Sequence, residues 1–160
     1  MTEVILYTDG AASGNPGPGG FGVVLRSGIH RKELSMGFRK TTNNRMELLG
    51  VNVGLEALKK PGTVVTVYSD SRYVVDAVEK RWVFEWEKKG FKGKKNPDLW
   101  KRFLTIFRKH QVKFIWVKGH ADIPENERCD HLAVQASKAP GLLIDLYYEA
   151  EHNNSAGIFT

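Results

Sequence analysis

The chain contains 160 residues, of which 41% are hydrophobic and 26% are charged. These values are typical of a globular protein and argue against a disordered, collagen-like or coiled-coil chain. The length suits one domain that buries about two-thirds of the surface its unfolded chain would expose. The single cysteine, Cys129, excludes an internal disulfide framework. Together with five scattered histidines it leaves no Cys/His set for a structural zinc site.

The N-terminal residues lack the basic and long apolar regions of a signal peptide. No stretch approaches the roughly 18 apolar residues that a membrane span requires. We therefore expect a cytoplasmic protein that has no membrane partner, and we expect it to be a monomer.

Charge is distributed unevenly along the chain. The net charge of +6 comes from 24 Lys and Arg residues against 18 Asp and Glu residues. Residues 80–102 hold nine basic and three acidic side chains, so this segment alone carries the whole excess. A local basic block indicates a polyanionic partner, whereas a uniformly basic surface would say little about partners.

The N-terminal part of the chain predicts three antiparallel strands. An apolar run over residues 4–8 ends at Asp9 and at a stretch rich in Gly, Ala and Pro, which predicts a strand that enters a long turn. Residues 21–26 and 32–38 alternate apolar and polar side chains around Gly28, which predicts a hairpin.

A helix is predicted next, and either Asn43 or Asn44 can cap it. It runs through residues 47–60, and its broad apolar face predicts packing on a sheet. Residues 63–68 form an unbroken β-branched run, as expected of a central strand that is buried on both faces. A helix over residues 71–80 follows.

The C-terminal half predicts two more helices and a strand. Asn96-Pro97-Asp98 opens a helix to about residue 110, since proline is well tolerated in a first helical turn. Residues 112–117 predict another buried strand, and residues 126–138 a helix with an apolar stripe that includes Cys129. The order β-β-β-α-β-α-α-β-α predicts an α/β fold with a five-stranded mixed sheet. We expect residues 1–140 to form the domain and residues 141–160 a tail packed on it.

Two predicted strands end in aspartate, at Asp9 and Asp70. The carboxyl ends of parallel strands are where α/β proteins bind ligands. Either acid alone could open a turn or cap a helix, but their repetition at equivalent strand ends favours a site.

Glu47 and Asp130 are candidates on helices. Glu47 lies amid apolar residues, where an unpaired carboxylate is costly to bury; a helix-dipole or Arg45 contact is the alternative. Asp130 lies about 100° round its helix from the apolar stripe, at the edge of the buried face, and the alternative is an exposed helix acid.

Four converging carboxylates cannot all stay charged without a cation, because their mutual repulsion would raise their pKa values. Mg²⁺ prefers oxygen ligands, keeps several waters and is completed by substrate phosphate. Two such ions roughly 4 Å apart could activate a water and stabilise the leaving oxygen of an in-line phosphodiester displacement.

Residues 17–22 formally match the pattern G-x-G-x-x-G. They precede a strand pattern and not a helix, so a dinucleotide-binding site is excluded. Backbone that a sugar-phosphate chain can approach closely is the better interpretation of these glycines.

The basic segment interleaves lysines with aromatic residues. Trp82 and Trp86 lie four residues apart on a possible helix, which fits core packing and nucleic-acid contact equally well. The lysines are less easily explained as an ordinary solvated face.

Together these motifs resemble bacterial type 1 ribonuclease H over about residues 3–138. The motifs are Tyr-Thr-Asp-Gly at 7–10, the glycine-rich stretch 14–20, Thr-Thr-Asn-Asn-Arg-Met-Glu-Leu at 41–48, Ser-Asp-Ser at 69–71, Val-Lys-Gly-His-Ala at 117–121 and Glu-Asn-Glu-Arg-Cys-Asp at 125–130. The resemblance implies the ribonuclease H-like fold, with helices on both faces of the sheet.

The resemblance also implies the site. Asp9, Glu47, Asp70 and Asp130 match the four metal-binding carboxylates of the family, which hold two Mg²⁺ ions with substrate, and Mn²⁺ can substitute. His120 matches a histidine on a flexible loop that handles protons and product release; taken alone it would be an ordinary surface histidine. A mobile loop between Gly119 and Ala121 suits such a role.

The implied partner is an RNA–DNA hybrid. Asn15, Thr42, Asn43 and Asn44 match substrate-contacting positions, suited to 2′-hydroxyls and phosphates. Residues 80–95 match a basic protrusion that grips the DNA strand. The protrusion supplies the candidates Trp82, Trp86, Lys88, Lys89, Lys92, Lys94 and Lys95. Arg72 falls where relatives often carry glutamine near the substrate.

The predicted function is an endoribonuclease that hydrolyses the RNA strand of RNA–DNA hybrids with two Mg²⁺ ions, leaving 3′-hydroxyl and 5′-phosphate ends. One alternative is a non-catalytic hybrid-binding or duplex-binding module, which the loss of an acid would favour, but all four acids are present. A second is an integrase-like or resolvase-like enzyme that acts on DNA. The asparagine cluster and the basic protrusion favour hybrids.

Overall fold

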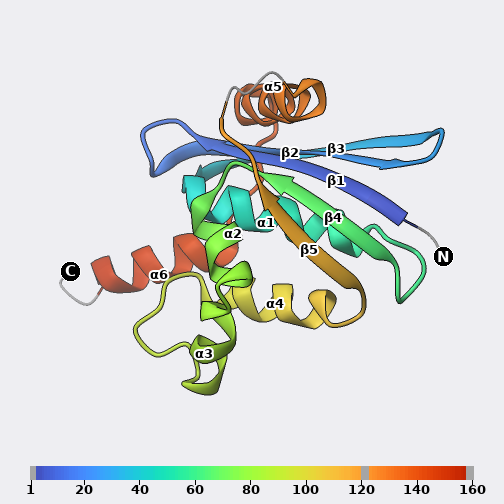
Figure 1. Ribbon diagram of the computed structural model, residues 1–160. Helices are drawn as coiled ribbons and strands as arrows, with labels where there is room; N and C mark the ends of the chain where they lie inside the picture. The colour runs from blue at the N-terminus through green and yellow to red at the C-terminus, as the bar shows by residue number, and fades with distance from the viewer. Residues whose placement is uncertain (1–2, 120–122, 158–160) are drawn as a thin grey trace.

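The computed structural model describes residues 3–119 and 123–157, with side chains up to residue 152. A five-stranded sheet in the order β3-β2-β1-β4-β5 forms its centre (Figure 1). The strands are β1 (Glu3–Ala12), β2 (Gly17–Ser27), β3 (His30–Thr41), β4 (Val64–Ser69) and β5 (Gln111–Trp116). Antiparallel pairing joins β1, β2 and β3, and β4 pairs in parallel with β1 and β5. The predicted mixed sheet is confirmed.

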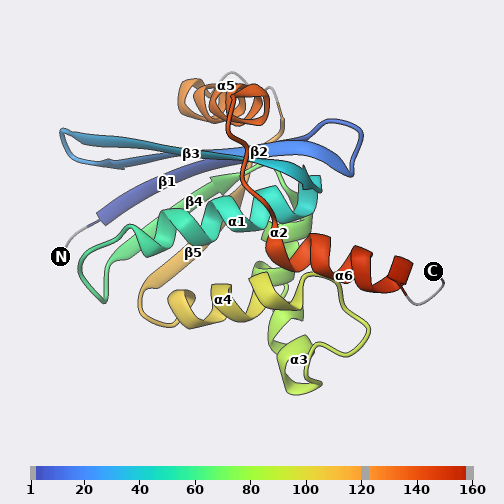
Figure 2. The same ribbon diagram turned by 180° about the vertical axis from the view of Figure 1, so that it is seen from behind.

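Helices cover both faces of this sheet. They are α1 (Asn43–Glu56), α2 (Arg72–Glu79), α3 (Trp82–Lys88), α4 (Pro97–Phe107), α5 (Pro124–Lys138) and α6 (Leu146–Gly157). One face carries α5, and the opposite face carries α1, α2 and α4, as both views show (Figures 1 and 2). In the part of the chain that the structure describes, no helix is long and apolar enough to cross a membrane.

The element order predicted from the sequence lacked α3 and α6. Helix α3 has only seven residues, which is too short to show a clear helical period in the sequence. A left-handed Arg81 (φ 64°) separates it from α2. The tail was expected to be a short packed segment. Helix α6 was not predicted because its sequence is largely polar and has no clear apolar face. Tertiary contacts hold α6, because Arg39 donates two hydrogen bonds of 2.9 Å to Glu149 and Tyr148 is buried.

The cap of α1 is Thr42, and neither Asn43 nor Asn44 takes that position. Thr42 has an extended backbone, and its hydroxyl accepts a hydrogen bond of 3.2 Å from the backbone N–H of Arg45. Asn43 is already helical, and its side chain accepts a 2.5 Å hydrogen bond from the backbone N–H of Ala12. Asn43 thereby joins the start of α1 to the end of β1.

The two C-terminal strands are less buried than their sequences predict. Buried and half-buried residues alternate along β4. In the edge strand β5 only Phe114 is buried, with 4% of its surface exposed. Among the described elements, α5 packs mainly on β1, β2 and β3, so the same face of β4 is half-buried and most of β5 is exposed. The predictions that residues 63–68 are buried on both faces and that residues 112–117 form a buried strand were therefore wrong.

Glycines in β2 and β3 let α5 approach the sheet at backbone distance. A Cβ atom at Gly20 would lie 2.6 Å from the carbonyl oxygen of Ala133, and one at Gly22 would overlap that of Cys129. Gly37 in β3 meets Ala136 in the same way. Helix packing therefore explains Gly20 and Gly22, and the interpretation that they face a sugar-phosphate chain was wrong.

Arg45 joins the tail and α4 to α1. Its buried guanidinium, 3% exposed, donates hydrogen bonds of 2.8 and 2.9 Å to Asp98 at the start of α4. It also donates bonds of 2.7 and 2.9 Å to Asp145, which precedes α6 and accepts a further bond from the Thr41 hydroxyl. A buried cation with two bidentate carboxylate partners is well compensated.

Candidate active site

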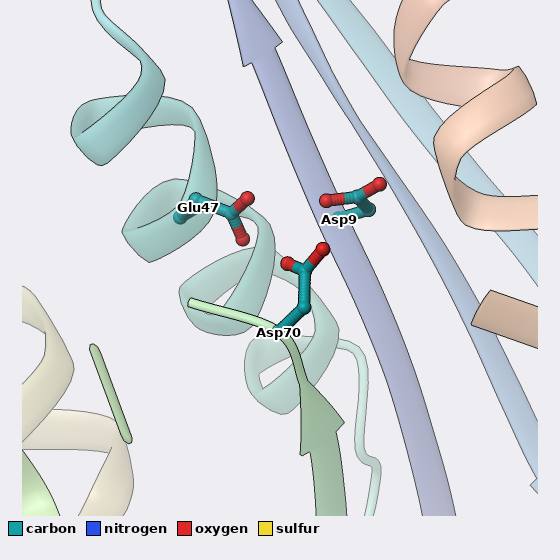
Figure 3. Close-up of side chains that lie close together, drawn as sticks. All are labelled: Asp9, Glu47 and Asp70. Atoms are coloured by element: carbon teal, nitrogen blue, oxygen red, sulfur yellow. The ribbon is translucent and has the colours of Figure 1, made fainter. Parts of the chain in front are cut away.

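Three carboxylates converge at one end of the sheet (Figure 3). Asp9 comes from β1, Glu47 from the second turn of α1, and Asp70 from the junction between β4 and α2. One carboxylate oxygen from each residue lies within 4.8 Å of the others. The structure thus brings together three of the four predicted acids.

Strand register places the two aspartates side by side. β1 and β4 run parallel with Tyr7 opposite Tyr68, so Asp9 and Asp70 each lie two residues further toward the same end. Antiparallel β2 fixes the other side of β1, where Asp9 lies opposite Gly22. The repeated aspartates at strand ends in the sequence were therefore a sound indication of one shared site.

Burial and mutual repulsion disfavour negative charge in this cluster. The pKa of Glu47 is raised well above its usual range, first by burial and then by the charges of Asp9 and Asp70. Burial, followed by the charge of Asp70, raises the pKa of Asp9 to about 7. A bound cation would reverse both effects, since an opposite charge favours the ionised form.

The donor atoms fit a divalent metal ion. Glu47 is 8% exposed, and its Oε2 atom is buried without a hydrogen-bond partner among the described residues. Burial of a carboxylate oxygen without a partner lowers the stability of the folded protein unless a ligand binds it. Arg45, the alternative partner considered for Glu47, is instead paired with Asp98 and Asp145. An all-carboxylate cluster is the type of site that binds hard divalent cations.

Asp130 approaches the cluster from the opposite face of the sheet. It lies on α5 and lines the same cleft, and its charge contributes to the raised pKa of Asp9. It is not one of the three residues whose ligand atoms lie within 4.8 Å of one another. Asp130 therefore stands at the edge of the carboxylate cluster.

An open cleft of about 730 Å³ surrounds the acids. Of the predicted substrate contacts, Asn43, Asn44 and Arg72 line it. Asn15 lies beside the cleft, where its side chain accepts a 3.0 Å hydrogen bond from the backbone N–H of Asn43. Asn15 and Thr42 thus brace the loop and the start of α1 instead of lining the cleft.

The basic segment lies outside the cleft. Its five candidate lysines are exposed, and Lys88 forms an ion pair of 3.2 Å with Glu85. Trp82 is 46% exposed, with the Lys80 ammonium 5.2 Å from its ring. Trp86 instead packs edge-on against Trp100 at 5.8 Å. The two tryptophans therefore differ, since one is available for contact and the other packs on the core.

His120 lies outside the described residues, so its predicted role stays a prediction. The sequence interpretation gave no role to several residues that line the cleft, which are Ser71, Tyr73, Lys118, Asn126, Glu127 and His131. Asn126 lies in the first turn of α5 and has a buried Oδ1 atom without a partner in the described part of the chain. Asn126 lies one helical turn before Asp130, and this spacing could have indicated that both side chains face the cleft.

Comparison with known proteins gives a consistent answer. The family model described as RNase H matches residues 1–138. A ribonuclease H of Desulforamulus reducens is 58% identical over 151 residues, covering 91% of this chain and 94% of the relative. The ribonuclease HI of Synechocystis is 51% identical and covers 89% of this chain and 92% of the relative.

Solved structures agree. LC9-RNase H1, titled a type 1 RNase H with the type 2 active-site motif, has a TM-score of 0.78 and 33% identity and covers 93% of this chain and 80% of its own. LC11-RNase H1, solved in complex with an RNA/DNA hybrid, has a TM-score of 0.61 and 26% identity, with coverage of 84% and 96%. The predicted resemblance and the predicted nuclease class are confirmed, and the chain belongs to the ribonuclease H family of hydrolases, which cleave RNA in RNA–DNA hybrids.

Proposed function

We propose that this chain is an endoribonuclease that hydrolyses the RNA strand of RNA–DNA hybrids and leaves 3′-hydroxyl and 5′-phosphate ends. The observation that carries the proposal is the convergence of Asp9, Glu47 and Asp70 in an open cleft, with a buried Glu47 oxygen that has no partner in the described structure. The LC11-RNase H1 structure supports the substrate, because its title names a complex with an RNA/DNA hybrid.

The metal is proposed to be Mg²⁺, as two ions with substrate, and Mn²⁺ can replace it. Asp9, Glu47, Asp70 and Asp130 are the residues that would hold it. Bound Mg²⁺ supplies a lowered pKa for the attacking water and neutralises charge on the leaving oxygen. The chain provides rigid supports for these ligands, since β1, α1 and α5 each fix one of them on a regular element.

Asn43, Asn44 and Arg72 are proposed to bind the substrate in the cleft. The asparagine amides lie at the start of α1, one turn before Glu47, where they can donate to 2′-hydroxyls and phosphates. Asn15 and Thr42 support this surface through their hydrogen bonds to the backbone of α1. Discrimination of RNA is thereby assigned to groups that are fixed beside the carboxylates.

The exposed lysines of residues 80–95 are proposed to follow the DNA strand, with Trp82 beside them. They lie on a projection that α3 and the following loop form beyond the sheet (Figure 1). Charges that lie outside the cleft contribute to affinity and leave the chemical step unaffected. We also propose residues 1–140 as the catalytic domain and residues 141–160 as a tail packed on it.

A cleavage assay tests the proposal. Labelled RNA–DNA hybrid, RNA duplex, DNA duplex and single-stranded RNA are incubated with the protein, with and without Mg²⁺. We expect Mg²⁺-dependent cutting of the RNA strand of the hybrid alone. Efficient cutting of the DNA duplex would instead support a resolvase-like enzyme, and hybrid binding without cutting would support a binding module.

The Asp9→Asn variant is the matched control for this assay. A neutral amide binds Mg²⁺ much more weakly than a carboxylate does, so cleavage is expected to be lost while hybrid binding remains. Near-normal turnover in this variant would overturn the metal mechanism.

A further inference from the structure

Trp116 stands beside the carboxylate cluster in a position that core packing does not explain. It is the last residue of the edge strand β5, and 36% of its surface is exposed. Its side chain nevertheless contacts Asp70 and Arg72, which both line the cleft. A large aromatic residue at an exposed strand end therefore connects two residues of the site.

The indole N–H of Trp116 holds the backbone of Asp70. It donates a hydrogen bond of 3.0 Å to the carbonyl oxygen of Asp70, which lies between β4 and α2. On the other side of Asp70, the backbone N–H of Ser71 donates a 3.0 Å hydrogen bond to the hydroxyl of Ser69. These bonds restrain the backbone of a residue that belongs to no helix or strand, and so fix the point from which its carboxylate extends.

The ring face of Trp116 holds Arg72. The guanidinium carbon of Arg72 lies 3.7 Å from the ring centroid, which is a close cation–π contact. The Arg72 side chain is 60% exposed, and its ion pair with Asp76 is long at 3.7 Å. The ring therefore limits the rotamers of a side chain that would otherwise move freely in solvent.

We propose that Trp116 is a positioning residue with two functions: its N–H orients Asp70 for metal binding, and its ring presents Arg72 to a backbone phosphate of the bound hybrid. The inference rests on the proposed function, which supplies the metal and the hybrid. A stacked guanidinium keeps its N–H groups free at the edge, which suits a phosphate. Positioning contacts of this kind support a site without touching the reacting atoms.

Three substitutions separate the two functions. Trp116→Phe keeps a ring face over Arg72 and removes the N–H, whereas Trp116→Leu removes both. Arg72→Gln removes the guanidinium and leaves the ring and the N–H of Trp116 in place. Ile115→Ala is the control, since Ile115 is equally exposed on the same strand, at 37%, and does not line the cleft.

For Trp116→Phe we expect Mg²⁺ binding to the free protein, measured by calorimetry, to weaken about tenfold, and kcat to fall by a similar factor. KM is expected to stay within about twofold of the parent value, because the ring still holds Arg72. Trp116→Leu is expected to show the same losses together with a KM about tenfold higher, as for Arg72→Gln.

The double variant Trp116→Leu/Arg72→Gln tests whether the two residues act together. Its KM is expected to equal that of Arg72→Gln alone, since the ring acts on the hybrid through Arg72. Additive KM effects would overturn the link to Arg72. Unchanged Mg²⁺ binding in Trp116→Phe, or an equal loss in Ile115→Ala, would overturn the link to Asp70.

Failure of the proposed function would look different. The calorimetric measurement needs no hybrid, so it judges the Trp116–Asp70 link even if the parent protein does not cut hybrids. A parent that cuts hybrids while Trp116→Phe and Trp116→Leu match it in every measurement would refute this inference alone.

Discussion

A Cβ atom at Gly10 would lie 2.5 Å from the backbone nitrogen of Glu47, so β1 and α1 meet at backbone distance beside the carboxylate cluster. This close approach is what brings Asp9 and Glu47 together from two different elements. Glycine at position 10 is required because the atoms that a side chain would meet are backbone atoms, which cannot move aside cheaply.

Gly10→Ala is therefore expected to push α1 away from β1. We expect a loss of about 1 to 3 kcal/mol in the free energy of unfolding, together with a large fall in kcat. Gly28→Ala is the matched control, since Gly28 has open space and a positive φ of 59° in the β2–β3 turn. It should lose stability through backbone strain while kcat stays unchanged, and equal kcat losses in both variants would contradict the assignment.

The stability of the metal-free protein is expected to depend on pH through the carboxylate cluster. Asp9 has a pKa of about 7 in the folded protein against its ordinary value of 3.8, so protonation favours folding. Its contribution is complete below about pH 4 and is lost as the pH rises through about 7. Thermal midpoints in EDTA should fall across this window, and Mg²⁺ should reverse the fall.

Asp9→Asn isolates this effect, because asparagine does not titrate. The difference in thermal midpoint between this variant and the parent in EDTA is expected to grow in favour of the variant from pH 4 to pH 8. A difference that stays constant with pH would show that Asp9 does not titrate as described.

Replacement of Arg45 by leucine leaves Asp98 and Asp145 without their shared cation. We expect a loss of about 3 to 5 kcal/mol in the free energy of unfolding, measured in urea, because two partly buried charges lose their partner. Asp145→Asn should cost less, since an amide still accepts a hydrogen bond. Equal stability of Arg45→Leu and the parent would refute the role of Arg45 in joining α1, α4 and the tail.

The two tryptophans of the basic segment should separate packing from binding. Trp86→Ala removes the edge contact with Trp100 and should lower the free energy of unfolding by about 2 kcal/mol or more. Trp82→Ala should leave stability within about 0.5 kcal/mol and raise KM for the hybrid, because Trp82 is exposed. Melting curves and KM values decide the matter, and the reverse pattern would contradict the structure.

Removal of the exposed lysines should weaken binding without slowing chemistry. Replacement of Lys88, Lys89, Lys92, Lys94 and Lys95 by alanine is expected to raise KM with kcat little changed. The slope of log K against log salt concentration should fall by up to about 0.9 for each phosphate that the protein no longer neutralises. Alanine at Lys32, Lys59, Lys60, Lys109 and Lys113, five exposed lysines outside the segment, is the control for net charge and should leave the slope unchanged.

The sequence predicted the sheet and the meeting of Asp9 and Asp70 from local signals, whereas the places of Glu47 and Asp130 followed from the family resemblance. Strand-end aspartates need only the strand order to meet, and parallel β1 and β4 supply it. The residues around the cluster were harder to predict. Thr42 caps α1 because the backbone is extended at that residue. The side chains of Asn43 and Asn44 suit a cap equally well, so the sequence could not distinguish the three positions.

Other differences come from tertiary contacts. Residues 112–117 have the composition of a buried strand, yet β5 forms an edge that α5 does not cover. The tail forms α6 through the Arg39–Glu149 and Arg45–Asp145 pairs, whose partners lie about 100 residues apart or more in sequence. No local pattern reports such pairs, and only the folded chain reveals them.

The backbone contact between α5 and the sheet also determines where α5 holds Asp130. Gly20, Gly22 and Gly37 have no side chains between the sheet and α5, the helix that carries Asp130. A single methyl group at one of them would lie 2.6 Å or less from a backbone carbonyl oxygen of α5, so the helix would have to move away from the sheet. The position of Asp130 relative to the other three carboxylates therefore depends on glycines of β2 and β3 that do not line the cleft.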